Sequence, residues 1–198
     1  MKKKEFSLLN FLISPVMLVI TGLPCLVMGR PVSQLFTLYK GQVTDYSARL
    51  SYSYPGIWQI FYEPADYDVY INYRMAAVTL AVAAMAGMMI YWLVTKKELT
   101  AKNTLYMAFL LVFTAVMFLP AMHERYDYIY VILGMMIVIL NKKTAPLFAG
   151  LCLLDLVTYS GYINEYWSHF NMTAVLIMAV ANVAIYGGFV GMLNKDME

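Results

Sequence analysis

The sequence predicts an all-α fold, a polytopic membrane helix bundle of about six transmembrane helices with one external amphipathic-helix and loop segment. Hydrophobic residues make up 62% of the chain and charged residues only 13%, whereas soluble domains average about 45–50% and about 25%. The hydrophobic residues also form long uncharged runs, and a helix of about 20 such residues crosses a hydrocarbon core. A water-soluble fold of this size would need more polar surface, so the sequence belongs to the membrane class.

The uncharged runs place the predicted spans along a single transmembrane domain, residues 1–198. Lys2–Lys4 resemble the start of a signal peptide, but the run 6–29 is longer than a signal core and predicts a retained helix. The fifth run is interrupted only by Asp155. The run 128–141 is short, about 21 Å as a helix, so a re-entrant segment is the alternative to a span there. The expected spans are 7–28, 74–95, 103–122, 126–141, 144–163 and 171–193.

The lysines predict the orientation of the bundle in the cell membrane. With both termini in the cytoplasm, every lysine except Lys40 falls in a cytoplasmic segment, as the positive-inside rule requires. All four arginines then fall on the external side. A guanidinium suits phosphate or carboxylate, so these arginines indicate an external anionic ligand; snorkelling to lipid headgroups is the alternative. Membrane lipids are the expected partners, and the net charge of +2 gives no argument for nucleic acid.

The region 29–73 is predicted to be the large external segment, an amphipathic helix followed by a turn. Pro31 suits the start of this helix, and Tyr54-Pro55-Gly56 breaks it as a turn. Aromatic residues follow the turn, beginning with Trp58. They are typical of an interfacial belt, and a shelf for a sugar ring or a prenyl chain is the alternative. The apolar positions at helical spacing are Leu35, Tyr39, Val43, Tyr46 and Leu50.

A short polar motif follows the third predicted span, on the external side. Pro120 should kink or end that helix. His123, Glu124 and Arg125 then place an imidazole, a carboxylate and a guanidinium at the membrane surface. The arginine can hold a phosphate bidentately, the histidine can donate to a phosphate oxygen or move a proton near neutral pH, and the glutamate can orient either of them. An ordinary polar turn with a local ion pair is the alternative.

The motif from Pro120 to Tyr126, Pro-Ala-Met-His-Glu-Arg-Tyr, resembles a signature near the end of bacterial membrane glycosyltransferases of the GT-C superfamily, the GPI-mannosyltransferase-like group. The segment 38–42, Leu-Tyr-Lys-Gly-Gln, and the turn 54–58, Tyr-Pro-Gly-Ile-Trp, resemble the external loop of those proteins. Gly56 stands where asparagine is more usual in the family. The resemblance covers essentially this whole chain but only the C-terminal part of the family.

The resemblance implies transfer of a hexose, mannose-like, from a polyprenyl-phosphate sugar on the external leaflet, with no covalently bound cofactor. The family's catalytic acid lies in a preceding external loop, so the chain is expected to be incomplete or inactive alone. A separate N-terminal catalytic half is then an expected partner, and a non-catalytic partner subunit is the alternative function. No catalytic residue, metal ligand or divalent metal is assigned. The expected lipid-phosphate and substrate residues are His123, Glu124, Arg125, Tyr126, Arg30, Gln42 and Trp58.

Asp155 is the polar residue predicted to lie within a span, the fifth. A carboxylate inside a membrane is costly and usually faces protein or a water-filled cavity. Proton handling or substrate contact is one interpretation, and a small transporter would follow from it. A hydrogen bond to Thr158, Ser160 or Asn182 is the alternative. Cys25 and Cys152 lie in apolar runs without metal-ligand spacing.

Overall fold

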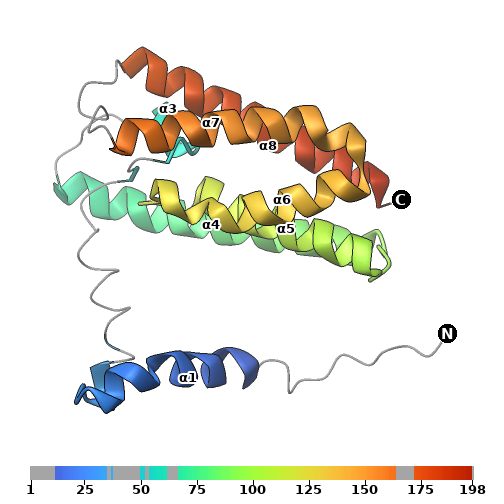
Figure 1. Ribbon diagram of the computed structural model, residues 1–198. Coiled ribbons are helices and arrows are strands. Elements are labelled where there is room, and N and C mark those ends of the chain that lie inside the picture. Colours follow the sequence, from blue (N-terminus) through green and yellow to red (C-terminus); the bar gives the residue numbers. More distant parts are fainter. Residues whose placement is uncertain are drawn as a thin grey trace. The chain divides into compact units, whose positions relative to one another are not determined.

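The computed structural model describes residues 12–34, 37, 50–51, 54–61, 67–163 and 172–197, and every regular element among them is a helix. This confirms the all-α class. The chain forms two compact units, Met1–Ser47 and Ala48–Glu198, which are described one after the other. Figure 1 shows the long helices of the second unit running alongside one another.

The first unit contains α1, Ile13–Val27. Gly29 ends this helix with a φ of +89°, a left-handed conformation that glycine adopts at little cost. The amide of Gly29 donates to the Leu26 carbonyl, and the amide of Arg30 donates to the Cys25 carbonyl over 3.1 Å. These bonds satisfy carbonyls that a helix end would otherwise leave without donors. The amphipathic helix predicted to follow lies mostly outside the described residues.

Among the described residues of the second unit, four helices are long and apolar enough to cross a membrane: Tyr73–Val94, Ala101–Phe118, Lys142–Gly161 and Thr173–Asp196. Their length and composition indicate a membrane protein. The expected count of six spans is not confirmed, because the apolar helices Pro15–Val27 and Tyr128–Leu140 are shorter. The elements of this unit are α3 (Trp58–Phe61), α4 (Tyr67–Val94), α5 (Ala101–Phe118), η2 (Glu124–Tyr126), α6 (Tyr128–Leu140), η3 (Lys142–Thr144), α7 (Ala145–Ile163) and α8 (Met172–Asp196).

Aromatic rings fill the centre of the second unit. Phe113 of α5 stacks on Tyr130 of α6 with ring centroids 4.4 Å apart, and Phe109 meets Phe189 of α8 edge-on at 4.8 Å. All four rings are fully buried, so they hold three helices together through the largest apolar surfaces available. Large apolar side chains point outward elsewhere, for example Leu80, Met89 and Ile90 on α4, Ile132 and Met135 on α6, and Leu153 and Leu156 on α7.

Gly134 lets α6 approach its neighbours closely. A Cβ added there would lie 2.9 Å from the Phe148 ring of α7 and 3.2 Å from the Phe109 ring of α5. No side chain fits between these rings without displacing them. Close packing of this kind through small residues is the usual way that membrane helices associate.

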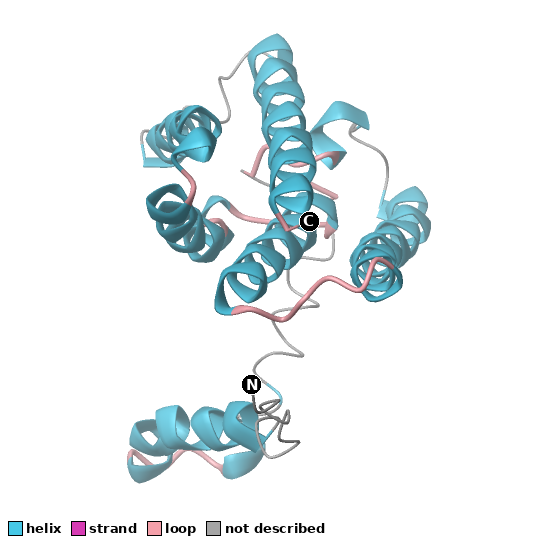
Figure 2. Cartoon of the chain, turned by 90° about the vertical axis from the view of Figure 1, so that its right-hand side faces the viewer, coloured by secondary structure: helices cyan, strands magenta, loops and turns pink. Residues whose placement is uncertain are grey.

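The second unit has a lysine end, where α4 meets α5, α6 meets α7, and α8 terminates (Figure 2). Asp196 of α8 is its hub. The Asp196 carboxylate accepts hydrogen bonds from Tyr106 over 2.8 Å and Asn141 over 3.0 Å, and it pairs with Lys102 at 3.1 Å. Trp92 donates to the Asn194 side chain over 2.7 Å. The lysines of this end are Lys96, Lys97, Lys102, Lys142, Lys143 and Lys195.

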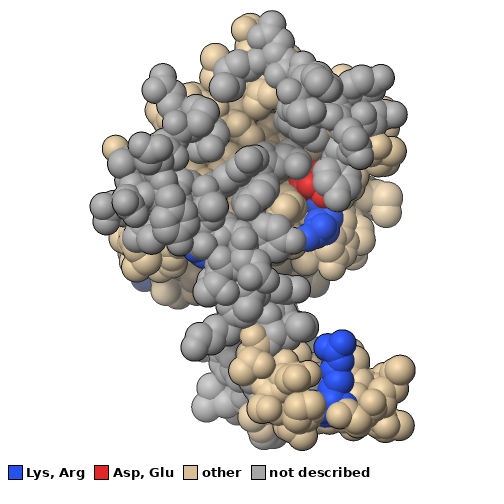
Figure 3. All heavy atoms as spheres, turned by 90° about the vertical axis from the view of Figure 1, so that its left-hand side faces the viewer, with Lys and Arg blue, Asp and Glu red and all other residues tan. Residues whose placement is uncertain are grey.

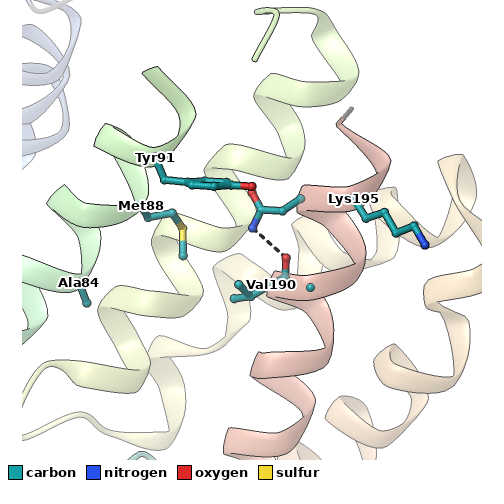
Figure 4. A pocket seen from close by; sticks show the side chains of 7 residues that line it. Ala84, Met88, Tyr91, Val190 and Lys195 are labelled. Atoms are coloured by element: carbon teal, nitrogen blue, oxygen red, sulfur yellow. Dashed lines mark hydrogen bonds between the residues drawn. The ribbon is translucent and has the colours of Figure 1, made fainter. Parts of the chain in front are cut away.

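A hollow of about 640 Å³ lies between α4 and α8 near the lysine end (Figure 4). It is mainly apolar. The Asn194 side chain in its wall donates to the Val190 carbonyl over 2.8 Å. The hollow therefore offers surface to apolar chains rather than to polar chemistry. Its wall includes Ala84, Met88, Tyr91, Val190, Gly191 and Asn194.

Candidate functional site

A cluster of polar side chains lies at the end of the second unit opposite the lysines. The helix α6 has 13 residues and α7 has 19, which correspond to about 20 Å and about 28 Å. The turn 119–127, between α5 and α6, therefore does not reach as far as the C-terminal end of α7. The contact of Asp127 with Tyr159, one helical turn before the end of α7, fits this placement: the tyrosine hydroxyl donates to Asp127 Oδ1 over 3.0 Å. We call the turn 119–127 and the side chains that it faces the recess, because the turn stops short of the end of α7.

The turn begins where the sequence predicts that a helix must stop. The helix α5 ends at Phe118 and Leu119 is extended, with a ψ of 142°, because the residue before a proline avoids the helical region. Ala121 then has a φ of +59°, which is uncommon for a residue other than glycine and costs about 1 kcal/mol. Its amide donates to the Leu50 carbonyl over 2.8 Å, which helps to hold the turn in this conformation.

The segment 54–61 folds against the end of α5, where the turn begins. The amide of Ile57 donates to the Met117 carbonyl over 3.3 Å, and the Trp58 indole donates to the Phe118 carbonyl over 2.7 Å. Both carbonyls belong to the last turn of α5, whose carbonyls lack donors within the helix. Gly56 permits this approach, since a Cβ there would lie 3.1 Å from the Met117 carbonyl oxygen. The segment thus serves as a cap for α5.

Tyr54 anchors this segment inside the bundle. Its hydroxyl lies 3.0 Å from the hydroxyl of Tyr130 on α6. The Asn182 amide on α8 donates over 3.0 Å both to that hydroxyl and to the Pro55 carbonyl. Tyr54 is 2% exposed and Asn182 is 1% exposed. Burial raises the pKa of Tyr54 well above its usual value, so its hydroxyl keeps its proton and can donate it to a neighbour.

The short helix η2 places some residues of the sequence motif on a buried side and others on an exposed side. His123 and Glu124 are buried, at 8% and 2% exposure, whereas Tyr126 is 39% exposed and Arg125 is exposed as well. The Arg125 guanidinium lies 5.8 Å from the centre of the Tyr126 ring. The imidazole and the guanidinium were both expected at the surface, but in the structure only the guanidinium is exposed.

His123 sits in surroundings that keep it neutral. Burial and the nearby Arg125 charge lower its pKa from the ordinary histidine value, outweighing the opposite effect of Glu124. Its Nδ1 lies 3.8 Å from Glu124 Oε2, which is longer than a hydrogen bond. Its ring meets the edge of the Tyr126 ring at 5.8 Å. A neutral imidazole can donate one proton and accept another, so it can orient a neighbouring ligand without adding charge.

Two aspartates from different helices meet in the recess. Asp127, which precedes α6, is 1% exposed, and its carboxyl group lies within hydrogen-bonding reach of Asp155 on α7. Burial, the largest effect, raises the pKa of Asp127 above its ordinary value. The alternative interpretation of Asp155, a hydrogen bond to Thr158, Ser160 or Asn182, did not include this partner.

The other predicted site residues do not join this cluster in the second unit. Arg30 belongs to the first unit, where its side chain is exposed. Gln42 lies outside the described residues. Trp58 lies beside the turn, and its indole donor is occupied by the Phe118 carbonyl. The indole therefore supports the end of α5, and only the ring surface of Trp58 remains for a ligand.

Sequence reasoning missed several residues of the recess. Asp127 directly follows the Pro-Ala-Met-His-Glu-Arg-Tyr motif, so the motif itself was a signal for it. Tyr54 was expected only in a turn and Asn182 only as a possible partner of Asp155. Nothing indicated that these two residues meet, because 128 positions separate them in the chain. Among the described residues, no group of three or more histidine, cysteine, aspartate or glutamate side chains is placed to hold a metal ion.

Figure 3 shows the second unit from this end, where acidic atoms (red) lie next to basic atoms (blue). The four long apolar helices indicate a helical membrane protein, and the polar cluster at the turn 119–127 lies at one end of its second unit. Comparison of the chain with protein-family models, curated proteins and solved structures finds no match. The relation to GT-C enzymes therefore stays a hypothesis.

Proposed function

We propose that the chain is the membrane module of a GT-C-type glycosyltransferase and that it binds the phosphate of a polyprenyl-phosphate sugar beside Arg125. One observation carries this proposal: an exposed arginine and a buried, neutral histidine lie on one short turn that is held from three directions. The turn continues directly from α5, its Ala121 amide donates to the Leu50 carbonyl, and Asp127 at its end accepts the Tyr159 hydroxyl of α7. A rigid turn loses little freedom when a ligand binds to it.

The chemistry of the turn suits a lipid phosphate. The Arg125 fork can donate two parallel hydrogen bonds to phosphate oxygens, and Tyr126 offers an aromatic face next to the same guanidinium. A phosphate held in this way is also a better leaving group, since the cation stabilises the negative charge that develops on it. The long apolar helices around the recess would contact the polyprenyl chain.

The proposed orientation places this end of the unit outside the cytoplasm. All six lysines of the second unit gather at the opposite end, and cytoplasmic segments carry the excess of lysine in membrane proteins. The two termini would then lie in the cytoplasm of a cell-membrane protein. The recess would face the external leaflet, where the enzymes that the motif resembles take their lipid donors.

The proposed module acts together with an N-terminal catalytic half. This chain resembles only the C-terminal part of the GT-C proteins, which does not include the loop with the family's catalytic acid. In addition, Asp127 is buried and poorly placed to reach an acceptor. We therefore expect no sugar transfer from this chain alone. Transfer by the purified chain from a polyprenyl-phosphate sugar would contradict this part of the proposal without affecting the phosphate site.

Lipid binding tests the proposal directly. The purified chain in nanodiscs is titrated with polyprenyl phosphate and, separately, with polyprenol, which lacks the phosphate. Arg125→Gln removes the guanidinium but leaves a polar side chain, and we expect it to weaken phosphate binding about tenfold or more, since a hydrogen bond to a charged group contributes about 1.5–3 kcal/mol. Arg74→Gln, on α4, is the matched control and should bind like the wild type. Equal affinity for the two lipids, or no effect of Arg125→Gln, would contradict the proposal.

A further inference from the structure

The recess holds more hydrogen-bond acceptors than donors. Asp127 Oδ1 accepts the Tyr159 hydroxyl, but Asp127 Oδ2 and Asp155 Oδ2 are buried without a donor in the part of the chain that the structure describes. The two carboxyl groups lie within hydrogen-bonding reach of each other. Two ionised carboxylates cannot share such a contact, because each has only acceptor oxygens and both carry negative charge.

Two further buried side chains add acceptors to this region. Glu124 is 2% exposed, its charge acts on both Asp127 and Tyr159, and its Oε2 accepts no hydrogen bond among the described residues. Asn182 Oδ1 is likewise buried without a donor there, although its amide nitrogen is fully used. A buried acceptor without a donor costs about 1–3 kcal/mol, so a missing proton would be expensive here.

Among the described residues, the groups that face the aspartate pair supply no compensating charge. From the turn come Glu124 and the neutral His123, and from the segment 54–61 comes Tyr54, whose hydroxyl stays protonated. Arg125, the permanent cation of the turn, is exposed. The remaining titratable neighbours are uncharged groups: Tyr130 on α6, and Cys152 and Tyr159 on α7. The described residues also form no three-ligand metal group.

We infer that Asp127 and Asp155 together form a proton-binding site, in which one proton lies between the two carboxyl groups. One carboxyl group carries the proton and donates it to the other, so the pair has one negative charge instead of two. Water at the recess supplies the proton and takes it back. No electron moves and no other bond forms or breaks.

The shared proton ties the start of α6 to the middle of α7. Its loss would place two negative charges in contact, with Glu124 close by, and would separate the turn from α7. The contact between the turn and α7 therefore depends on pH. This inference does not rest on the proposed lipid function, since its readouts need no ligand.

The pH dependence of folding tests the inference. A carboxyl pKa that is raised in the folded state contributes stability that is lost as pH rises, from the ordinary aspartate value of about 3.9 through the raised pKa. The folded-to-unfolded ratio of the wild type should fall by up to about tenfold per pH unit in that window, the slope for one proton. Asp155→Asn, whose amide donates to Asp127 in place of the proton, should flatten this slope. Glu98→Gln, at an exposed carboxylate of the lysine end, should keep the wild-type slope.

Infrared spectroscopy of the folded wild type gives a second test that needs no variant. A protonated-carboxyl band should be present at neutral pH and should disappear as pH rises, in step with the loss of stability. An unchanged pH slope in Asp155→Asn, or the absence of a protonated-carboxyl band at neutral pH, would overturn the inference.

Discussion

The two ends of the second unit differ in the partners that surround their carboxylates. At the lysine end, Asp196 pairs with Lys102 and accepts hydrogen bonds from Tyr106 and Asn141. In the recess, Asp127 has Tyr159 as its donor and a second carboxyl group as its neighbour. A compensated carboxylate that joins three helix ends is explained by its structural role. An uncompensated pair of carboxyl groups lowers the stability of the fold, so its presence indicates a purpose other than stability. The recess is therefore the end where function is expected.

Loss of the Asn182 amide should have the largest effect on the recess. Asn182→Leu removes two buried hydrogen bonds, to Tyr54 and to the Pro55 carbonyl; the carbonyl loses its donor, and Tyr54 keeps only Tyr130 as a partner. We expect the free energy of unfolding to fall by about 2–4 kcal/mol, from about 1–3 kcal/mol for each buried group that loses its partner. Denaturant unfolding in micelles measures this. Val180→Leu, at an exposed position of α8, should leave the free energy of unfolding almost unchanged. An equal loss in the two variants would contradict the role of Asn182 in holding Tyr54.

Two tryptophans, one at each end of the second unit, test whether the ends differ in function. Trp58 and Trp92 each donate one hydrogen bond of 2.7 Å, the first beside the recess and the second at the lysine end. Trp58→Phe and Trp92→Phe should each lower stability by about 1 kcal/mol. Only Trp58→Phe should also weaken polyprenyl-phosphate binding, because it loosens the support of the turn. A similar loss of binding in Trp92→Phe would show that the two ends are not distinct.

His123 should give the recess a second pH dependence, of opposite sign to that of the aspartates. Its pKa is lowered in the folded state, so the unfolded chain binds the proton more tightly, and stability is lost as pH falls below the ordinary value of about 6.5. His123→Gln should flatten the stability curve on the acid side of that value. Thermal unfolding between about pH 5 and about pH 7 checks this, and an unchanged acid slope would contradict the burial of a neutral imidazole.

The ion pair at the lysine end should contribute least. Lys102 and Asp196 are 43% and 37% exposed, and exposed pairs contribute about 0–1 kcal/mol. Asp196→Asn keeps an oxygen acceptor for Tyr106 and Asn141, so we expect a loss of about 0.5 kcal/mol that shrinks as salt is added. Unfolding at low and high ionic strength measures it. A loss that does not change with salt would show that the charge of Asp196 is not the stabilising feature.

The apolar runs of the sequence indicate where most helices of the second unit lie. The predicted spans 144–163 and 171–193 correspond to α7, Ala145–Ile163, and α8, Met172–Asp196, because a long apolar run has few alternatives in a membrane protein. The span 103–122 extends past the end of α5 at Phe118, although Pro120 already indicated a break there.

The recess could be predicted only in part. The sequence motif gave Arg125 and His123 from residue chemistry, but not which of them is buried, since this depends on the direction of one short helical turn. The meeting of Asp127 with Asp155, and of Tyr54 with Asn182, depends on how separate helices pack. No local pattern encodes such contacts, and two acidic side chains in contact are contrary to what charge alone would predict.

The most direct test of the central claim is to map where a polyprenyl phosphate binds. A polyprenyl phosphate with a photoreactive group next to its phosphate is cross-linked to the chain in nanodiscs, and the labelled residues are identified by mass spectrometry. The account predicts labelling between residues 119 and 130, reduced by Arg125→Gln and unchanged by Arg74→Gln. Labelling concentrated around Lys97 and Lys195 would contradict it.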